Sequence, residues 1–223
     1  MTAYCFPVQE TQTEPRRAAT RGHKRFAAFW DWAVRHESRE GRAARAEVTG
    51  GATGRVLELG VGVGANWEHL PEGVDYSGIE PDPFMVERAR KHAAERGQDY
   101  DIHAAPAETL PFDDATFDTV IVTLTLCTVQ DVHQALAEAR RVLQPGGELR
   151  FGEHVRANGR AGAWFQDRFT PLWRKLGAGC HLNRATADAI RGAGFEITEL
   201  KRWRQGFMPM ITGVARAPGG TDA

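Results

Sequence analysis

The stretch VLELGVGVGAN, residues 56–66, decides the fold predicted for this chain. Apolar residues run directly into a glycine-rich turn, which is the pattern of a buried strand followed by a helix. Gly60, Gly62 and Gly64 allow the backbone to turn tightly and to approach a ligand, because glycine has no Cβ. The stretch therefore predicts a site for a nucleotide-type cofactor.

An acidic residue at the end of the next predicted strand supports this interpretation. Glu80 ends the strand VDYSGIE, where its carboxylate can accept hydrogen bonds from both hydroxyls of a ribose. The glycines alone also satisfy the looser dinucleotide fingerprint, so a nicotinamide or flavin enzyme remains an alternative at this point. A glycine turn that serves only strand-to-helix packing is the structural alternative.

Composition limits the remaining classes of function. The 223 residues fit one domain, and the net charge of -1 gives no global basic field for nucleic acid or an anionic membrane. The three cysteines lie far apart and show no zinc-finger spacing, so the sequence predicts neither a metal site nor a disulfide framework. No apolar run is long enough for a membrane span, and the first residues lack the order of a signal peptide. We therefore expect a cytoplasmic protein without stable membrane insertion.

The chain divides into three predicted parts. Residues 1–20 are polar and are expected to form a flexible segment. Residues 21–47 are expected to form a helical lid, because Phe26, Phe29, Trp30 and Ala33 recur at helical spacing. This apolar stripe either packs on the core or brings Trp30, Trp32 or Asp31 to a substrate. Residues 48–218 are expected to form the cofactor-binding domain.

Strands alternate with helices through this domain, which predicts a Rossmann-like, doubly wound α/β fold with a mostly parallel sheet. The run FDTVIVTLTL, residues 117–126, is the fourth strand, and QPGG closes the helix DVHQALAEARRVL before the fifth. The helix AWFQDRFTPLWRKLG is expected to bend or break at Pro171. Two final strands form a hairpin, so we expect seven strands with the last one antiparallel.

These motifs together resemble the class I S-adenosylmethionine-dependent methyltransferases over about residues 48–216. VLELGVGVG is similar to their first motif, AAPAETLPF to the adenine loop, and RRVLQPGGEL to the entry of the fifth strand. Pro106 stands where many members have an aspartate that bonds the adenine. The resemblance implies S-adenosylmethionine as cofactor, S-adenosylhomocysteine as product, and the cofactor-binding residues Glu58, Gly60, Gly62, Gly64, Asn66, Glu80, Pro81, Ala107, Glu108, Thr123 and Leu124.

A narrower resemblance concerns the methyl acceptor. ELGVGVGANWEHLP, LTLCTVQD, GEHV and AGCHLNR resemble the microsomal thiol S-methyltransferase-like group and bacterial enzymes of the phospholipid N-methyltransferase type. The apolar amino-terminal anchor of the animal proteins is missing, so membrane attachment is not expected. A small apolar thiol is the first acceptor predicted, and an amine or a phosphatidylethanolamine-type headgroup is the second. A non-catalytic cofactor-binding protein and an NAD-dependent oxidoreductase are the alternatives of another class.

Methyl transfer from a sulfonium requires an oriented nucleophile and no metal. A thiol or amine must also lose a proton, so a base near neutral pKa would help. His154 is the first candidate, because it ends the predicted fifth strand on the ligand side of the sheet. His181 and Asp31 are the other catalytic candidates, and Cys127 is interpreted as a small buried residue.

Overall fold

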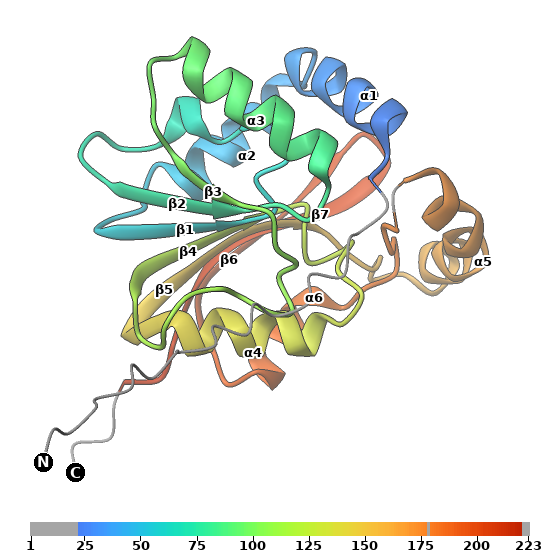
Figure 1. The fold of residues 1–223 in the computed structure, drawn as a ribbon. Coiled ribbons are helices and arrows are strands. Elements are labelled where there is room, and N and C mark those ends of the chain that lie inside the picture. Colours follow the sequence, from blue (N-terminus) through green and yellow to red (C-terminus); the bar gives the residue numbers. More distant parts are fainter. Residues whose placement is uncertain (1–21, 178, 220–223) are drawn as a thin grey trace, which may run out of the picture.

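The computed structural model describes residues 22–177 and 179–219, and the predicted segment 1–20 lies outside these ranges. A seven-stranded sheet forms the centre, in the order β3-β2-β1-β4-β5-β7-β6 (Figure 1). The strands are β1 (Arg55–Leu59), β2 (Asp75–Ile79), β3 (Asp101–His103), β4 (Phe117–Thr123), β5 (Leu143–His154), β6 (Glu196–Gln205) and β7 (Met208–Arg216). The helices are α1 (Lys24–Arg35), α2 (Arg39–Thr49), α3 (Pro83–Glu95), α4 (Val132–Val142), α5 (Arg160–Leu176), α6 (Thr186–Gly192) and the 3-10 helix η1 (Trp67–His69).

The pairing of the strands confirms the predicted fold class. β1 pairs in parallel with β2 and β4, and the parallel set extends to β3 on one side and to β5 on the other. β7 runs antiparallel to both of its neighbours, β5 and β6. The carboxyl ends of the five parallel strands therefore meet at one edge of the sheet, which is where ligands bind in such folds.

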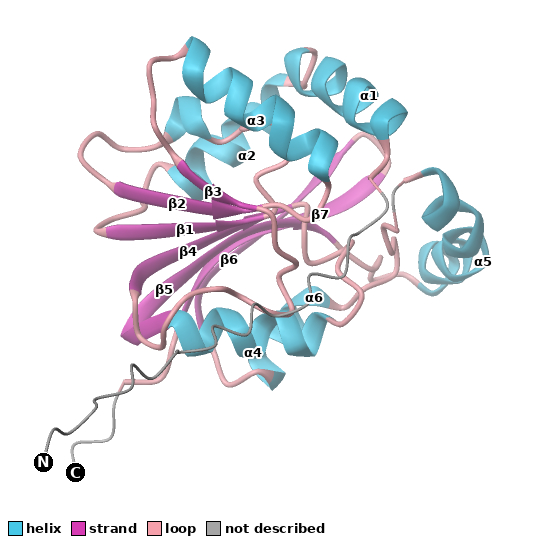
Figure 2. Cartoon of the chain, viewed as in Figure 1, coloured by secondary structure: helices cyan, strands magenta, loops and turns pink. Residues whose placement is uncertain are grey.

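Helices cover both faces of the sheet (Figure 2). α4 and α6 pack on one face, where Leu57, Val120 and Leu149 of the strands meet Leu136 and Ile190 of the helices. α2 and α3 lie on the opposite face, and α1 packs outside them against α3. α5 stands away from both layers beside the carboxyl edge of the sheet (Figure 1).

Four boundaries differ from the predicted ones. The lid of residues 21–47, predicted as one helix, is two helices, because the side chain of Ser38 accepts a hydrogen bond from the Gly41 amide (3.1 Å) and begins α2. β4 stops at Thr123, because Leu124 takes a positive φ of 54°. The stretch QPGG belongs to β5 and does not close α4. α5 continues through Pro171, so of the predicted bend or break the break does not occur.

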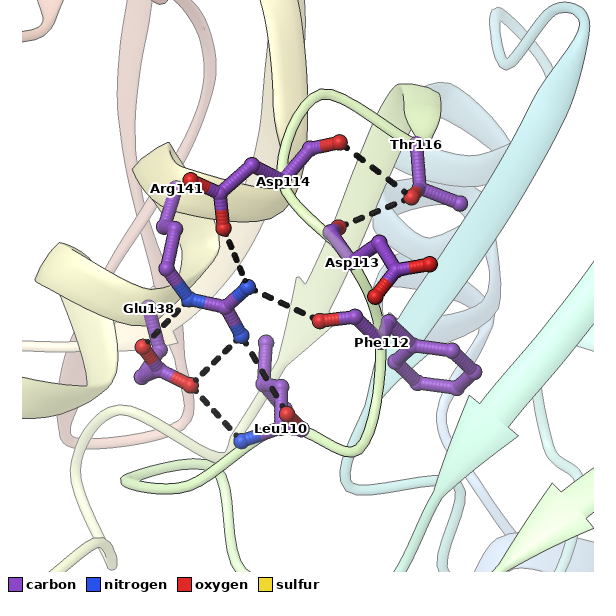
Figure 3. A network of polar contacts seen from close by, with 7 residues as sticks. All are labelled: Leu110, Phe112, Asp113, Asp114, Thr116, Glu138 and Arg141. Carbon is purple, nitrogen blue, oxygen red and sulfur yellow. Dashed lines mark hydrogen bonds and ion pairs between the residues drawn. The ribbon is translucent and has the colours of Figure 1, made fainter.

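A network around Arg141 of α4 holds the loop that leads from β3 to β4 (Figure 3). Its guanidinium donates to both carboxylate oxygens of Glu138 (2.8 and 2.9 Å) and to the carboxylate of Asp114 (2.7 Å). It also donates to the carbonyl oxygens of Phe112 (2.8 Å) and Leu110 (3.2 Å). Glu138 closes the ring by accepting from the Leu110 amide (2.8 Å). The hydrogen bond to Arg141 also lowers the pKa of Glu138.

We predict that Arg141→Met lowers the melting temperature by several degrees. Several charge-assisted hydrogen bonds are lost together, at a total cost of about 2 kcal/mol. The matched control is Arg140→Met on the same helix, because Arg140 makes one hydrogen bond, to the Ala193 carbonyl (3.2 Å). Thermal unfolding of both variants measures the difference, and equal melting temperatures would show that the ring does not hold the loop.

Candidate functional site

The glycine loop after β1 has the conformation that its sequence predicts. Gly60, Gly62 and Gly64 have φ values of 75°, 58° and 85°, which side chains rarely adopt. A Cβ on Gly60 would lie 2.2 Å from the Thr125 hydroxyl, and one on Gly64 would lie 2.3 Å from the Trp67 ring. The loop therefore packs closely on its neighbours and can accommodate no side chain at Gly60 or Gly64.

Glu80 lies directly against this loop. One carboxylate oxygen accepts from the Gly62 amide (3.0 Å), and the other accepts from the Asp82 amide (2.9 Å). The residue is 7% exposed, and burial raises the pKa of its carboxyl to about 7 despite these two hydrogen bonds. The predicted ribose-binding acid and the predicted glycine loop thus form one structural unit at the carboxyl ends of β1 and β2.

Glu58, Asn66 and Thr123 were also predicted to bind the cofactor, and the structure places them in a buried network beneath the loop. Glu58 accepts hydrogen bonds from the Asn66 amide (2.8 Å) and the Tyr76 hydroxyl (2.6 Å). The Asn66 amide also donates to the Thr123 hydroxyl (2.9 Å). Complete burial raises the pKa of Glu58 to about 7. Within this network, the three residues fix the position of the loop.

Arg45 of α2 completes the network and was not found by sequence reasoning. Its guanidinium donates to Asn66 Oδ1 (3.0 Å) and the Thr123 hydroxyl (3.2 Å), and it pairs with Glu37 (2.9 Å). An arginine in a polar helix ordinarily indicates a solvated face, yet this one is only 7% exposed. Nothing in the local pattern distinguishes it from the exposed Arg42 one turn earlier.

The other predicted cofactor residues lie at the same edge of the sheet. Ala107 is buried in the loop after β3, whereas Pro106 is exposed. The carboxylate of Glu108 accepts from the amides of Gln130 (2.8 Å) and Asp131 (3.2 Å), which ties the adenine-loop candidate to the start of α4. Pro81 follows Glu80 directly in the chain.

α1 lies beside the glycine loop. A Cβ built on Gly62 would lie 3.5 Å from the Trp30 indole nitrogen. Asp31 is held in ion pairs with Arg88 of α3 (2.8 Å) and Arg35 of its own helix (3.1 Å). The carboxylate of Asp31 therefore anchors α1 to α3, and the cluster of catalytic candidates described below does not include it.

A buried carboxylate organises the turn after β4. Glu153 accepts hydrogen bonds from the amides of Thr125 (2.8 Å), Leu126 (2.9 Å) and Cys127 (3.2 Å). Leu124, the residue before Thr125, has a positive φ of 54°. Its backbone amide donates to the Gly152 carbonyl oxygen (2.8 Å). Sequence reasoning missed Glu153, although an acid among apolar residues at a strand end was a signal that it binds backbone amides.

Two of the three catalytic candidates, His154 and His181, meet beside this turn. His154 is buried, and its Nε2 lies 2.6 Å from Cys180 Sγ. His181 donates its amide to the Cys127 carbonyl (2.8 Å). Ligand atoms of Cys127, His154 and Cys180 all lie within 4.8 Å of one another. This group of three side chains is called the Cys–His–Cys cluster below.

The titration of these groups is strongly perturbed. Burial lowers the pKa of His154, but the hydrogen bond and charge of Cys180, together with Glu153, outweigh it and raise the pKa above its ordinary value. The hydrogen bonds from Cys127 and His154 lower the pKa of Cys180. Burial and the charge of Arg184 lower the pKa of His181. At neutral pH, the lowered pKa leaves His181 neutral.

A pocket of about 300 Å³, open space at its mouth included, lies between α2, the ends of β4 and β5, and the β6–β7 hairpin. Its wall includes Leu124, Gly152, Trp203 and Met210. Apolar groups make up most of this wall, but the enclosed part of the pocket is only about 20 Å³, room for about one water molecule. No helix among the described residues is long and apolar enough to cross a membrane.

Comparison with known proteins defines the family. A methyltransferase-domain model matches residues 57–151. Thiol S-methyltransferase TMT1B of Homo sapiens is 39% identical over 160 residues, which are 68% of this chain and 65% of that protein. Phosphatidylethanolamine N-methyltransferase of Cereibacter sphaeroides is 32% identical over 139 residues, which are 61% of this chain and 68% of that protein.

A solved structure agrees with these relatives. A SAM-dependent methyltransferase from Thermotoga maritima is 25% identical, has a TM-score of 0.63, and is matched over 87% of this chain and 97% of its own. The fold and the loop therefore define a Rossmann-like methyltransferase architecture. The chain belongs to the methyltransferase family, and within it the chain is similar to the thiol S-methyltransferases and to a phosphatidylethanolamine N-methyltransferase.

We predict that Arg45→Met destabilises the protein by about 3–5 kcal/mol, because Glu37 and Asn66 lose a buried charged partner. Arg45→Met combined with Glu37→Gln should recover part of this loss, since the unpaired carboxylate is removed. Arg42→Met on the exposed side of α2 is the control. Urea unfolding measures all three variants, and a double variant no more stable than Arg45→Met would contradict the ion-pair account.

Proposed function

We propose that this chain is an S-adenosylmethionine-dependent methyltransferase that transfers a methyl group to a small thiol. The observation that carries the cofactor assignment is the contact of Glu80 with the glycine loop, where its carboxylate accepts from the Gly62 amide at 3.0 Å. A carboxylate in this position can accept from both ribose hydroxyls. The family membership supports the same cofactor.

The described residues suit the parts of that cofactor. Gly60, Gly62 and Gly64 would lie behind the methionine part, and Glu80 with Pro81 would hold the ribose. Ala107 and Glu108 would border the adenine, and Thr123 and Leu124 would flank the sulfur at the end of β4. Glu58 and Asn66 act by holding the loop, because their polar atoms bind one another within the buried network.

The sulfonium supplies its own leaving group, so the chain must orient the acceptor and accept its proton. His181 suits the role of base best, because its Nδ1 lies 3.2 Å from the Cys127 carbonyl oxygen beside the turn after β4, and burial and the charge of Arg184 lower its pKa. The Nε2 of His154 is engaged with Cys180 Sγ, so His154 is less available than His181 as a base. Asp31 suits the role of an anchor for the lid.

The choice of a thiol rests on similarity. The human relative named as a thiol S-methyltransferase is 39% identical, but this chain spans only 65% of its length. The phosphatidylethanolamine N-methyltransferase, at 32% identity, supports an amine headgroup as the second candidate. A cytoplasmic location remains part of the proposal, since free Cys127 and Cys180 suit a reducing compartment.

We predict that binding of S-adenosylhomocysteine weakens about tenfold for each pH unit below about 7 and levels off above it. The carboxyl of Glu80 has its pKa raised to about 7, and only its charged form can accept from both ribose hydroxyls. Cofactor binding favours the carboxylate, so affinity is complete above pH 7 and is lost as the pH falls. Calorimetric titration from pH 5.5 to 8 measures this slope.

Glu80→Gln is the control for this slope, because an amide does not titrate. Its affinity should be weaker than that of the natural chain above pH 7 and nearly independent of pH.

S-adenosylhomocysteine at 100 times its Kd should add about 2.7 kcal/mol of stability to the natural chain, whereas NAD at the same concentration should not raise the melting temperature. A shift with NAD alone would overturn the cofactor assignment.

We predict that a screen with methyl-labelled S-adenosylmethionine labels small apolar thiols in preference to amines, phenols and phosphatidylethanolamine. His181→Gln should lower turnover about 10²–10⁴-fold at pH 7, and part of the loss should return as the pH approaches the thiol pKa of about 8.5. Product analysis by mass spectrometry identifies the methylated atom. Labelling of amine headgroups alone would replace the thiol assignment with the second candidate.

A further inference from the structure

The Cys–His–Cys cluster has a donor set that neither the fold nor cofactor binding requires. Two thiol sulfurs and one imidazole nitrogen converge within 4.8 Å, although Cys180 follows His154 by 26 residues. Their wide separation is why the sequence showed no metal-ligand spacing. The side chains of Cys127 and His154 are buried, and that of Cys180 is partly exposed to solvent.

Each member is placed by a separate anchor. The Cys127 amide donates to Glu153 (3.2 Å), and Glu153 in turn precedes His154 at the end of β5. The loop that carries Cys180 is fastened to the turn after β4, because the His181 amide donates to the Cys127 carbonyl (2.8 Å). Arg184 donates to the carbonyls of Leu126 and Val129. Three segments from distant parts of the chain are thus fixed around one point.

The chemistry of the donors is that of zinc. Zn²⁺ prefers thiolate and imidazole ligands in a tetrahedron, and bond lengths of about 2.0–2.3 Å place its ligand atoms about 3.5–3.8 Å apart. To match this geometry, the 2.6 Å separation between His154 Nε2 and Cys180 Sγ must widen by about 1 Å, which a rotation of the partly exposed Cys180 side chain can supply. Sites with three protein ligands typically keep a fourth position open for a water or a substrate.

We propose that Cys127 Sγ, Cys180 Sγ and His154 Nε2 bind a Zn²⁺ ion whose fourth position takes the sulfur of the methyl acceptor. Binding of the ion releases protons from the ligands, since it requires thiolates and a neutral imidazole. The ion with two thiolates is neutral, and a third thiolate gives the group a charge of −1. Arg184, whose guanidinium contacts the same turn, can balance that charge.

The second half of this proposal rests on the proposed thiol methylation. The acceptor thiol loses its proton to His181 or to solvent and binds as thiolate. Its sulfur then forms a bond to the methyl carbon of S-adenosylmethionine, and the bond from that carbon to the sulfonium sulfur breaks. The products are a neutral thioether, which is a weak ligand and leaves, and S-adenosylhomocysteine. No oxidant or reductant is needed.

The position of the cluster fits this role. A Cβ on Gly60 would meet the side chain of Thr125 at 2.2 Å, so the turn after β4 packs against the glycine loop. Cys127 follows Thr125 by two residues on that turn, and both amides bind Glu153. The cluster therefore lies beside the edge where the proposed cofactor binds.

The first test measures metal content. The full chain is reduced, incubated with ZnCl₂ or CoCl₂, freed of loose ion by gel filtration, and analysed for bound metal. We expect one ion per chain, and the Co²⁺ form should show the intense near-ultraviolet charge-transfer absorption of cysteine thiolates. Cys180→Ser and His154→Gln should lose at least about tenfold in affinity. Cys5→Ser should bind as the natural chain does.

Two results would overturn the ion site. One is a natural chain, kept reduced throughout, that retains no Zn²⁺ or Co²⁺. The other is full retention of the ion by Cys180→Ser. Because Cys180 is partly exposed, its replacement leaves the core intact, and a melting curve confirms folding. The test therefore still decides the question if a Cys127→Ser variant, which changes a buried side chain, fails to fold.

The second test separates the ion site from the proposed function. A thiol acceptor added to the Co²⁺ protein should change its visible spectrum, since the fourth ligand changes, and an amine of the same shape should not. Bound Co²⁺ with an unchanged spectrum would overturn coordination of the acceptor. If the ion binds but only amines are methylated, the proposed thiol methylation fails while the ion site stands.

Discussion

The site depends on the buried carboxylate of Glu153. Three consecutive backbone amides at the end of β4 point at it, and without this acceptor they would be buried with no partner. The turn they form packs against the glycine loop and carries Cys127. It also receives the segment that brings Cys180 and His181. One side chain on β5 thus determines how β4, the glycine loop and the segment after α5 meet.

A second constraint acts from the amino-terminal helices. Arg45 reaches from α2 to the side-chain oxygen Oδ1 of Asn66 beneath the glycine loop, and Asp31 ties α1 to Arg88 of α3. The two helices predicted as a lid are therefore part of the support of the site. The pocket wall beneath α2 follows from this arrangement, since Arg45 itself lines it.

The sequence predicted what depends on local pattern. The glycine turn, the acid of the second strand, the parallel strands and the antiparallel end all follow from periodicity and residue type, and the structure confirms the fold class. The sequence could not predict contacts between segments that lie far apart in the chain. Arg45 resembles any polar helix residue, and Cys180 comes near His154 only because α5 and its following loop return to the sheet edge. The sequence predicted a bend or a break at Pro171, and α5 runs through that residue without a break.

The most direct test of this account is a crystal structure of the chain with bound S-adenosylhomocysteine. The account predicts that the ribose hydroxyls contact the carboxylate of Glu80 and that the homocysteine sulfur faces the turn after β4, on the side of Cys127. In that complex, the Gly62 amide would donate its hydrogen bond either to the ligand or, as in the present structure, to the carboxylate of Glu80. A cofactor bound elsewhere, or one whose sulfur points away from Cys127, His154 and Cys180, would contradict it.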